Sequence, residues 1–351
     1  MNKFYCYSPF IVRNITKNEV IPCCKAIRDE ESNNLISVDE MKNKFKNNNI
    51  PLECVNCNVK LHMNKYNMKD VYEENIKRLE IQLGRACNAT CRICFLSNEF
   101  DTITHMTLDK TLYTSIIEKH RNTIEFINLY GGETFLYEQE ILDILSLLQK
   151  DTYIHLHTNG TIINKNIINE LIKFEKLDLK ISIDGTNETN HLTRNKCDIN
   201  KILEFIDYFK SIDAFNKLRV NITISTLNVF NLNETISYIK SLGFSNENIC
   251  LNFVTNYDIY FIGNLYPEEK LKLYNKIIKD KDLLEVIKDK DEFKLLLSLI
   301  KEPFWKISEM ERNRRDVIRY KLTEEIKKFN IKFNIVENDI SNLYKILDIK
   351  L

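Results

Sequence analysis

The stretch LEIQLGRACNATCRIC, residues 79–94, decides how the rest of the chain is interpreted. Its first five residues alternate apolar and polar side chains, which is typical of a β-strand with one covered face. Cys87, Cys91 and Cys94 come shortly after this strand. Because α/β folds place their functional sites beyond the carboxyl ends of their strands, the three thiols predict a metal or redox site there.

Five more strand-like runs follow the first, and a segment with the apolar spacing of a helix separates each from the next. The runs span residues 125–130, 153–157, 178–183, 219–225 and 249–254. Such alternation predicts βαβ units and a parallel sheet. With right-handed crossovers, these strands make either an open doubly wound sheet or part of a barrel.

Each run is apolar at one parity and polar at the other, with His155, His157, Asn221 and Thr223 among the polar positions. A parallel strand covered by helices on both faces would instead be a continuous apolar run. We therefore expect an α/β fold built on a partial (β/α)6 barrel. Helices should cover one face of the sheet, and the polar face should line a cavity.

The composition is that of an ordinary globular protein, with 44% hydrophobic and 28% charged residues among 351. Fifty basic residues balance fifty acidic ones, so binding to nucleic acid or to a membrane surface is not expected. We see no secretory signal and no apolar run of about 20 residues. A cytoplasmic location is therefore expected, where structural disulfides among the ten cysteines are disfavoured.

Three thiolates are one ligand short of a closed metal site. Four saturate a structural zinc ion or a 4Fe–4S cluster, whereas three leave one iron with a position for a substrate or cofactor. The spacing of Cys87, Cys91 and Cys94 also fits a zinc ion that takes a fourth ligand from elsewhere. Both alternatives remain open from the cysteines alone.

The cysteine loop resembles the signature of the radical S-adenosylmethionine (SAM) enzymes, in which it follows the first strand of a partial (β/α)6 barrel. Later strand ends carry further family motifs in order, although Ile93 stands where many members have an aromatic residue. By this resemblance, the expected SAM-binding residues are Gly131, Gly132, Glu133, Thr158, Asn159, Ser182, Asp184, Arg194, Ser225 and Asn228. The resemblance covers roughly residues 76–265.

The resemblance also implies a reaction. Cys87, Cys91 and Cys94 would hold a 4Fe–4S cluster whose open iron chelates SAM. A reductant such as flavodoxin or ferredoxin would supply an electron, and cleavage of SAM would give a 5′-deoxyadenosyl radical that abstracts a hydrogen atom from the substrate. The protein's part in this oxidoreductase chemistry is to position the reactants and to exclude water.

A second set of cysteines precedes the barrel and resembles the twitch or SPASM modules, which hold an auxiliary 4Fe–4S cluster. The expected ligands are Cys6, Cys23, Cys54 and Cys57. Asn18 stands where relatives have a glycine in the hairpin, and asparagine also tolerates a left-handed turn. Cys24 is an alternative to Cys23, and a structural zinc ribbon is an alternative to the cluster.

We expect three parts in the chain: an auxiliary-cluster module over residues 1–75, the barrel over 76–265 and a helical extension over 266–351. The extension contains charged segments with helical spacing, and charge runs of this kind usually lie on solvated helix faces.

The substrate is less defined. Enzymes with an auxiliary cluster often crosslink, epimerise or oxidise peptides, so a peptide is the first expectation and a sugar, nucleoside or other small molecule the alternative. Cys197 is a candidate hydrogen-atom donor for an epimerase, and His155 and His157 are candidate acid–base groups. An interpretation of another class is a non-catalytic iron–sulfur or zinc protein that carries electrons or acts as a scaffold.

Overall fold

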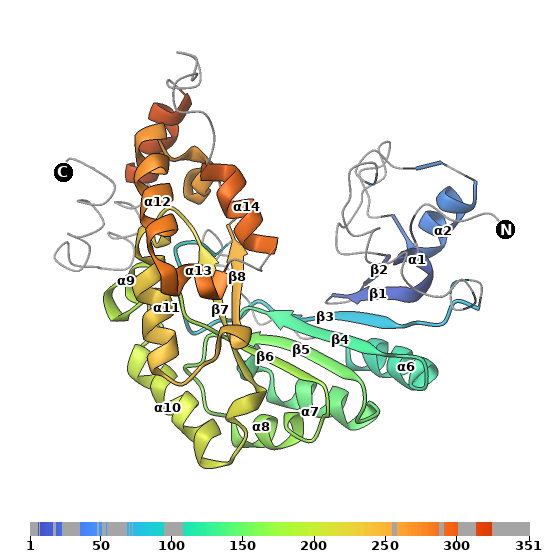
Figure 1. Cartoon of the computed structure of the whole chain (residues 1–351). Coiled ribbons are helices and arrows are strands. Elements are labelled where there is room, and N and C mark those ends of the chain that lie inside the picture. The colour runs from blue at the N-terminus through green and yellow to red at the C-terminus, as the bar shows by residue number, and fades with distance from the viewer. Residues whose placement is uncertain are drawn as a thin grey trace. The chain divides into compact units, whose positions relative to one another are not determined.

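The computed structural model describes residues 6, 8–16, 19–22, 36–47, 49–50, 54, 69, 71, 73–94, 108–254, 258–287, 291–300 and 314–324. Within these residues, eight strands form one sheet in the order β2-β1-β3-β4-β5-β6-β7-β8 (Figure 1). The strands are β1 (Val12–Ile15), β2 (Val20–Ile21), β3 (Arg78–Gly84), β4 (Phe126–Gly131), β5 (Tyr153–Thr158), β6 (Leu177–Ser182), β7 (Leu218–Ile224) and β8 (Ile249–Phe253).

Strands β3 to β8 coincide with the six predicted runs to within about two residues at each end. The pairs β3–β4, β4–β5 and β7–β8 are parallel. From β3 onward, the strands lie in the sheet in the order in which they occur in the chain. The predicted fold class, a mixed α/β chain with the strand–helix order of a partial (β/α)6 barrel, is confirmed.

The chain divides into two compact units. The first comprises Met1–Cys87, Ile103–Thr158 and Ile163–Leu179, and the second comprises Asn88–Thr102, Asn159–Ile162 and Lys180–Leu351. Strand β6 therefore begins in one unit and ends in the other. The three-part division expected from the sequence follows other boundaries and stays a prediction.

In the first unit, α6 (Lys110–His120), α7 (Glu138–Leu147) and α8 (Lys165–Leu171) cover one face of strands β3 to β5 (Figure 1). The side chains of Asp109 and Asn164 accept hydrogen bonds from the first backbone amides of α6 and α8. Burial alternates residue by residue along β5. The apolar parity is buried in all three strands, as Ile81, Ile127, Leu129, Ile154 and Leu156 show.

The N-terminal segment contributes α1 (Ser8–Ile11), the strands β1 and β2, and α2 (Val38–Lys46). Strands β1 and β2 pair antiparallel, whereas Asn18 and Cys23 of the hairpin expected there lie outside the described residues. Strand β1 also pairs in parallel with β3. This extension of the sheet was not predicted.

In the second unit, the end of β6 and the whole of β7 and β8 alternate with α9 (Asn187–Thr193), α10 (Ile199–Ser211) and α11 (Leu232–Ser241). Asp198 caps α10 by accepting a hydrogen bond from the amide of Asn200, and the helix buries an apolar face. Short 3-10 helices also occur in both units of the described chain. They are η2 (Thr134–Leu136), η3 (Phe215–Lys217), η4 (Val229–Asn231), η5 (Asn246–Asn248), η6 (Asp258–Tyr260) and η7 (Ile262–Asn264).

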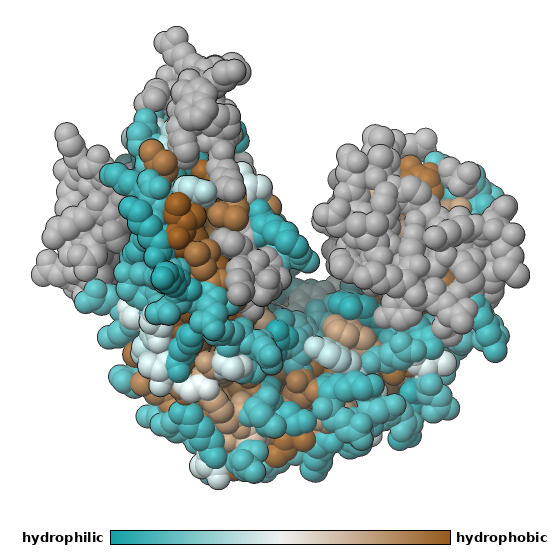
Figure 2. Space-filling view, in the orientation of Figure 1, coloured by the Kyte–Doolittle hydropathy of each residue, from teal (hydrophilic) through white to brown (hydrophobic). Residues whose placement is uncertain are grey.

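The C-terminal segment continues with α12 (Pro267–Lys279), α13 (Lys281–Ile287) and α14 (Asp291–Ile300), and residues 314–324 are also helical. The described part of the expected extension is therefore helical. Figure 2 shows a largely hydrophilic surface with apolar side chains in small groups. In the part of the chain that is described, no helix combines the length and the apolar character needed to cross a membrane.

Candidate functional site

The ends of β3 and β4 meet through backbone atoms. The amide of Gly132 donates to the carbonyl of Gly84 at 3.0 Å, and the amide of Glu133 donates to the carbonyl of Ala86 at 2.9 Å. A Cβ on Gly132 would lie 2.2 Å from the Ala86 oxygen, and one on Gly131 would lie 2.5 Å from the Gly84 oxygen. Both glycines are therefore required where β4 approaches the segment that leads into the cysteine loop.

Tyr137 contacts the same segment. Its hydroxyl accepts a hydrogen bond of 2.7 Å from the amide of Ala86. Burial of this side chain raises the pKa of Tyr137, which keeps the phenol neutral at ordinary pH. The sequence analysis missed Tyr137, because a tyrosine four residues after Glu133 is not a motif that distinguishes it from a core residue.

Glu133 joins the end of β4 to the end of β5. Its Oε1 accepts hydrogen bonds from the amide of Phe135 at 3.0 Å and from the hydroxyl of Thr158 at 2.7 Å. The exposed fractions of Glu133 and Thr158 are only 1% and 2%. Two residues that the sequence placed in one site are thus brought together, and the carboxylate of Glu133 is largely engaged within the protein.

The second unit holds the turn that follows β5. Gly160 has a φ of +72°, a conformation that favours glycine. Beside it, the side-chain amide of Asn159 donates to Oδ1 of Asn88 at 2.7 Å, and the side-chain amide of Asn88 donates to the hydroxyl of Thr161 at 2.8 Å. The predicted residue Asn159 is therefore tied to the cysteine loop through Asn88, a residue that the sequence did not single out.

None of Cys87, Cys91 and Cys94 forms a disulfide in the described structure, and all three are partly exposed. Within the described residues, no three His, Cys, Asp or Glu side chains are gathered as a metal site requires. The shared site for these three cysteines therefore stays a prediction.

Hydrogen bonds join the cysteine loop to the residues at the end of α9. The amide of Thr90 donates to the carbonyl of Asn195, and the amide of Arg92 donates to the carbonyl of Thr193, both at 3.0 Å. The side-chain amide of Asn195 also donates to the hydroxyl of Thr90 at 2.8 Å. These contacts fix the loop on both sides of Cys91, and Asn195 is a positioning residue that the sequence analysis missed.

Cys91 lies beside a second thiol and a guanidinium. Hydrogen bonding to Cys197 lowers the pKa of Cys91, with Arg194 adding to the effect and burial opposing it. Cys197 itself is buried, at 2% exposure. Cys197 and Arg194 thus both interact with Cys91, whereas the role of Cys197 as a hydrogen-atom donor stays a prediction.

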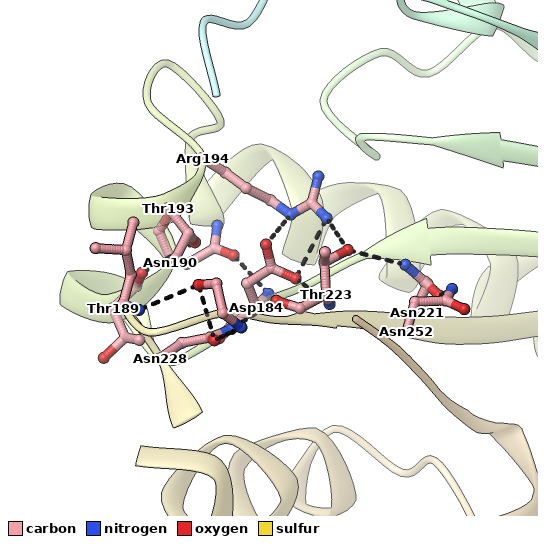
Figure 3. A network of polar contacts seen from close by, with 11 residues as sticks. Asp184, Thr189, Asn190, Thr193, Arg194, Asn221, Thr223, Asn228 and Asn252 are labelled. Carbon is pink, nitrogen blue, oxygen red and sulfur yellow. Dashed lines mark hydrogen bonds and ion pairs between the residues drawn. The ribbon is translucent and has the colours of Figure 1, made fainter. Parts of the chain in front are cut away.

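Asp184 and Arg194 form a buried ion pair (Figure 3). Nε of Arg194 lies 2.8 Å from Oδ2 of Asp184, and Nη2 lies 3.2 Å from Oδ1. The amide of Thr223 donates to the same Oδ1 at 2.7 Å. The sequence assigned both charged residues to SAM, and the structure places them in contact with one another.

The electrostatics of this pair follow from its burial. Asp184 is completely inaccessible to solvent. Burial raises the pKa of Asp184, and the neighbouring guanidinium of Arg194 opposes that rise. For Arg194, burial opposes the charged form, but Asp184 raises the pKa of the guanidinium overall, so the cation is maintained.

Amide side chains surround the pair (Figure 3). Oδ1 of Asn190 accepts from the amide of Asp184 at 2.9 Å. Asn228 donates to the carbonyls of Asp184 and Thr223 at 3.1 and 3.0 Å, and its Oδ1 accepts from the amide of Ser225 at 2.8 Å. Ser225 and Asn228, both predicted, are thus brought to Asp184, whereas Asn190 and Thr223 were not singled out for this role.

Three further polar side chains of the second unit are buried: Ser182, Asn190 and Thr226. Ser182 is buried at the end of β6. The hydroxyl of Thr226 and the side-chain nitrogen of Asn190 are buried without a hydrogen-bond partner among the described residues. Because buried polar groups are normally paired, these two atoms are candidates to contact a polar ligand in the second unit.

The N-terminal cysteines are only partly described. Cys6 and Cys54 are both 8% exposed and belong to one apolar cluster, which also contains Phe10 and Met41. Cys23, Cys24 and Cys57 lie outside the described residues. The auxiliary cluster therefore stays a prediction.

Comparison with known proteins supports one family. Residues 81–242 match the model of the Radical SAM superfamily. A GTP 3′,8-cyclase from Clostridium perfringens is 29% identical over 229 residues, which are 63% of this chain and 65% of that protein. An S-adenosylmethionine-dependent nucleotide dehydratase from Psychrobacter lutiphocae is 28% identical over 165 residues, which are 42% of this chain and 55% of that protein. The chain thus spans less than two thirds of either relative.

Among solved structures, native anSMEcpe with bound AdoMet has a TM-score of 0.47 and 18% identity, covering 58% of this chain and 60% of anSMEcpe. Streptococcus suis SuiB bound to S-adenosylmethionine has a TM-score of 0.44 and 15% identity, covering 68% of this chain and 56% of SuiB. Similarity at this level does not support an inference about what this chain binds or modifies.

Proposed function

We propose that this chain is a radical SAM enzyme, which cleaves SAM reductively and begins its reaction by removing a hydrogen atom from a substrate. The observation that carries the proposal is the contact of Gly131 and Gly132 with the segment leading into the three-cysteine loop. The family match over residues 81–242 supports it independently.

The residues fit the cofactors that the family implies. Cys87, Cys91 and Cys94 are partly exposed thiols outside any disulfide of the described structure, and thiolates are the usual protein ligands of iron–sulfur clusters. The buried hydroxyl of Thr226, unpartnered among the described residues, provides a place for a polar group of SAM. When bound, the 4Fe–4S cluster and SAM supply the electron transfer and the 5′-deoxyadenosyl radical.

The chain's own residues position these groups. Gly131 and Gly132 keep the end of β4 close to the segment that enters the cysteine loop, and Glu133 fixes the end of β5 through Thr158. Asp184 holds the guanidinium of Arg194 by Nε and Nη2. In the proposed site, the guanidinium of Arg194 would pair with the carboxylate of SAM, as guanidinium groups do in many carboxylate sites.

An auxiliary 4Fe–4S cluster on Cys6, Cys23, Cys54 and Cys57 is part of the proposal. Its support is the resemblance to the twitch and SPASM modules, together with the shared apolar cluster of Cys6 and Cys54 and the β1–β2 hairpin. A reductant such as flavodoxin or ferredoxin would supply the electron for the reaction.

Two substrate classes follow from different observations. A peptide is the first candidate, because modules with an auxiliary cluster often accompany peptide modification. A nucleotide is the second candidate, since the matched relatives are named as a GTP cyclase and a nucleotide dehydratase.

The test is formation of 5′-deoxyadenosine from SAM by anaerobically reconstituted and reduced protein. The wild type should form it, and the variant Cys87→Ala/Cys91→Ala/Cys94→Ala should not. Cys250→Ala, on β8 and outside the proposed site, is the matched control and should retain the activity. A wild type that binds zinc but neither iron nor SAM would overturn the proposal. Consumption of added GTP would favour the nucleotide class.

A further inference from the structure

Three side chains in the first unit form a continuous hydrogen-bonded series. They lie on strands β5 and β6, which are neighbours in the sheet (Figure 1). Oδ2 of Asp178 lies 2.7 Å from Nδ1 of His155, and Nε2 of His155 lies 3.0 Å from Nε2 of His157. Asp178 is buried, at 5% exposure, while both histidines are partly exposed. None of the three has a part in the SAM site proposed above.

The series lies on the polar face of the sheet. Strand pairing places Asn128 beside His155 and Glu80 beside Asn128. Asn128 donates to Oε2 of Glu80 at 2.6 Å, and its Oδ1 is buried without a hydrogen-bond partner among the described residues. This face therefore presents an unused acceptor next to the histidines, which suits a ligand with N–H or O–H groups.

One end of the series adjoins the proposed site. His157 directly precedes Thr158, whose hydroxyl donates to Glu133. The carbonyl of His157 accepts a hydrogen bond of 2.7 Å from the hydroxyl of Thr134. The backbone of His157 is thus fixed by the turn that follows β4, and its ring extends from the same strand end.

The contacts determine the tautomers of the neutral series. A carboxylate only accepts hydrogen bonds, so Nδ1 of His155 carries the proton that points to Asp178. Nε2 of neutral His155 is then an acceptor, and Nε2–H of His157 must donate to it. The basic nitrogen of His157 in this state is Nδ1.

One added proton reverses the direction of the hydrogen bond between His157 and His155. If Nδ1 of His157 takes up a proton, Nε2–H of His157 can pass its own proton to Nε2 of His155. His157 is then neutral again, and the positive charge lies on His155 beside the carboxylate of Asp178. This position is favoured electrostatically, because a buried carboxylate stabilises an adjacent imidazolium.

Other charged groups share this face. Arg78 and Glu80 of β3 form an ion pair with each other. Lys180 stands two residues after Asp178 on β6 and so at the same parity. These groups carry one net positive charge between them, so the negative charge that stabilises the protonated series comes from Asp178.

We propose that His157 is a catalytic base that removes a proton from the substrate, with His155 and Asp178 as positioning residues that take over the charge. This proposal rests on the proposed function. It selects substrates whose reacting carbon carries a hydroxyl or amino group, since loss of a hydrogen atom from that carbon makes the O–H or N–H much more acidic. The O–H or N–H bond breaks, its electron pair stays on the substrate, and an Nδ1–H bond forms on His157.

The first test is spectroscopic and needs neither cofactor. In the full-length, cluster-free protein labelled with ¹⁵N-histidine, His155 should be the Nδ1–H tautomer and His157 the Nε2–H tautomer at neutral pH. Asp178→Asn should weaken proton uptake by the pair at least about tenfold, which is about one pH unit. His120→Gln, on α6, should remove one set of signals and leave the pair unchanged. The opposite tautomer at His155, or no effect of Asp178→Asn, would overturn the claim that His155 and Asp178 take over the proton of His157.

The second test distinguishes the proton transfer between His157 and His155 from its role in catalysis. His157→Gln should still form 5′-deoxyadenosine and bind SAM, but the yield of modified substrate per 5′-deoxyadenosine should fall at least tenfold. Asp178→Asn should shift the pH profile of that yield to lower pH, because a base that holds its proton less tightly becomes active at lower pH. An unchanged yield in His157→Gln would overturn the catalytic role. If the wild type forms no 5′-deoxyadenosine, the proposed function fails and the catalytic role of His157 fails with it, while the spectroscopic result on the proton transfer is unaffected.

Discussion

The two compact units position their candidate residues by different physical means. In the first, Gly131 and Gly132 allow backbone to meet backbone, with a Cβ at Gly132 excluded by an oxygen 2.2 Å away. In the second, Asp184 and Arg194 are held by a buried ion pair and by amide side chains. The first arrangement has no room for an added side-chain atom, and the second is destabilised when one charge of the pair is removed. Substitutions in the two units should therefore destabilise the protein for different reasons.

The largest effect is expected in the second unit. Asp184→Ala leaves the guanidinium of Arg194 buried without its counter-ion, which should cost about 3–5 kcal/mol of the free energy of unfolding. Urea unfolding of the cluster-free protein measures this. The double variant Asp184→Ala/Arg194→Met removes the orphaned charge and should recover part of the loss. If the double variant is no more stable than Asp184→Ala, the ion pair is not what holds this region.

Gly132→Ala should come next and should act through crowding. Its Cβ would collide with the Ala86 and Arg85 carbonyl oxygens, at 2.2 and 2.5 Å, so the backbone must shift at a cost of about 3 kcal/mol. SAM-dependent formation of 5′-deoxyadenosine should be lost with it. Gly243→Ala is the control, because its Cβ meets only ordinary contacts and the change tests backbone strain alone, at a φ of +103°. Equal losses in both variants would argue against crowding as the cause.

Glu133 allows charge and hydrogen bonding to be separated. Glu133→Ala removes the acceptor for both Phe135 and Thr158, at an expected cost of about 2 kcal/mol of unfolding free energy. Glu133→Gln keeps an oxygen in place and should cost less than about 1 kcal/mol. Thermal unfolding with SAM-binding titration distinguishes the variants. A Gln variant as unstable as the Ala variant would show that the negative charge itself is needed for folding.

The smallest effect on stability is expected where the cysteine loop is hydrogen-bonded to Asn195. Asn195→Ala removes one hydrogen bond to the hydroxyl of Thr90 and should cost about 1 kcal/mol. The two backbone bonds that accompany it remain. Asn200→Ala, at an exposed position on α10, should change stability by less than about 0.5 kcal/mol. If Asn195→Ala instead unfolds the loop, as hydrogen exchange at residues 90–94 would reveal, the side chain matters more than the backbone.

The strands from β3 onward were predictable because each alternates apolar and polar residues with period two. That pattern also identified the polar face on which His155 and His157 lie. Strand β1 was not predicted to join the sheet, since four residues of VRNI carry no signal for a partner more than 60 residues away. The short length of this strand, rather than an unusual composition, explains the miss.

The sequence identified candidate residues for the site but not the contacts between them. Gly131, Gly132, Asp184 and Arg194 were identified from motifs at strand ends. That Asp184 binds Arg194, and that the glycines meet the backbone leading into the cysteine loop, depend on distances that no spacing encodes. Tyr137 and Asn195 were missed for the same reason, because a single tyrosine or asparagine on or near a helix does not stand out from its neighbours.

The central claim is that three cysteines leave one position of a cluster for SAM. It is tested most directly by electron paramagnetic resonance of the reduced variant Cys6→Ser/Cys23→Ser/Cys54→Ser/Cys57→Ser, in which Cys87, Cys91 and Cys94 remain. If this variant does not fold, the difference spectrum of the wild type with and without SAM replaces it. We predict a 4Fe–4S signal whose g values change when SAM is added. A signal that saturating SAM leaves unchanged, or a protein that takes up zinc and no iron, would contradict the account.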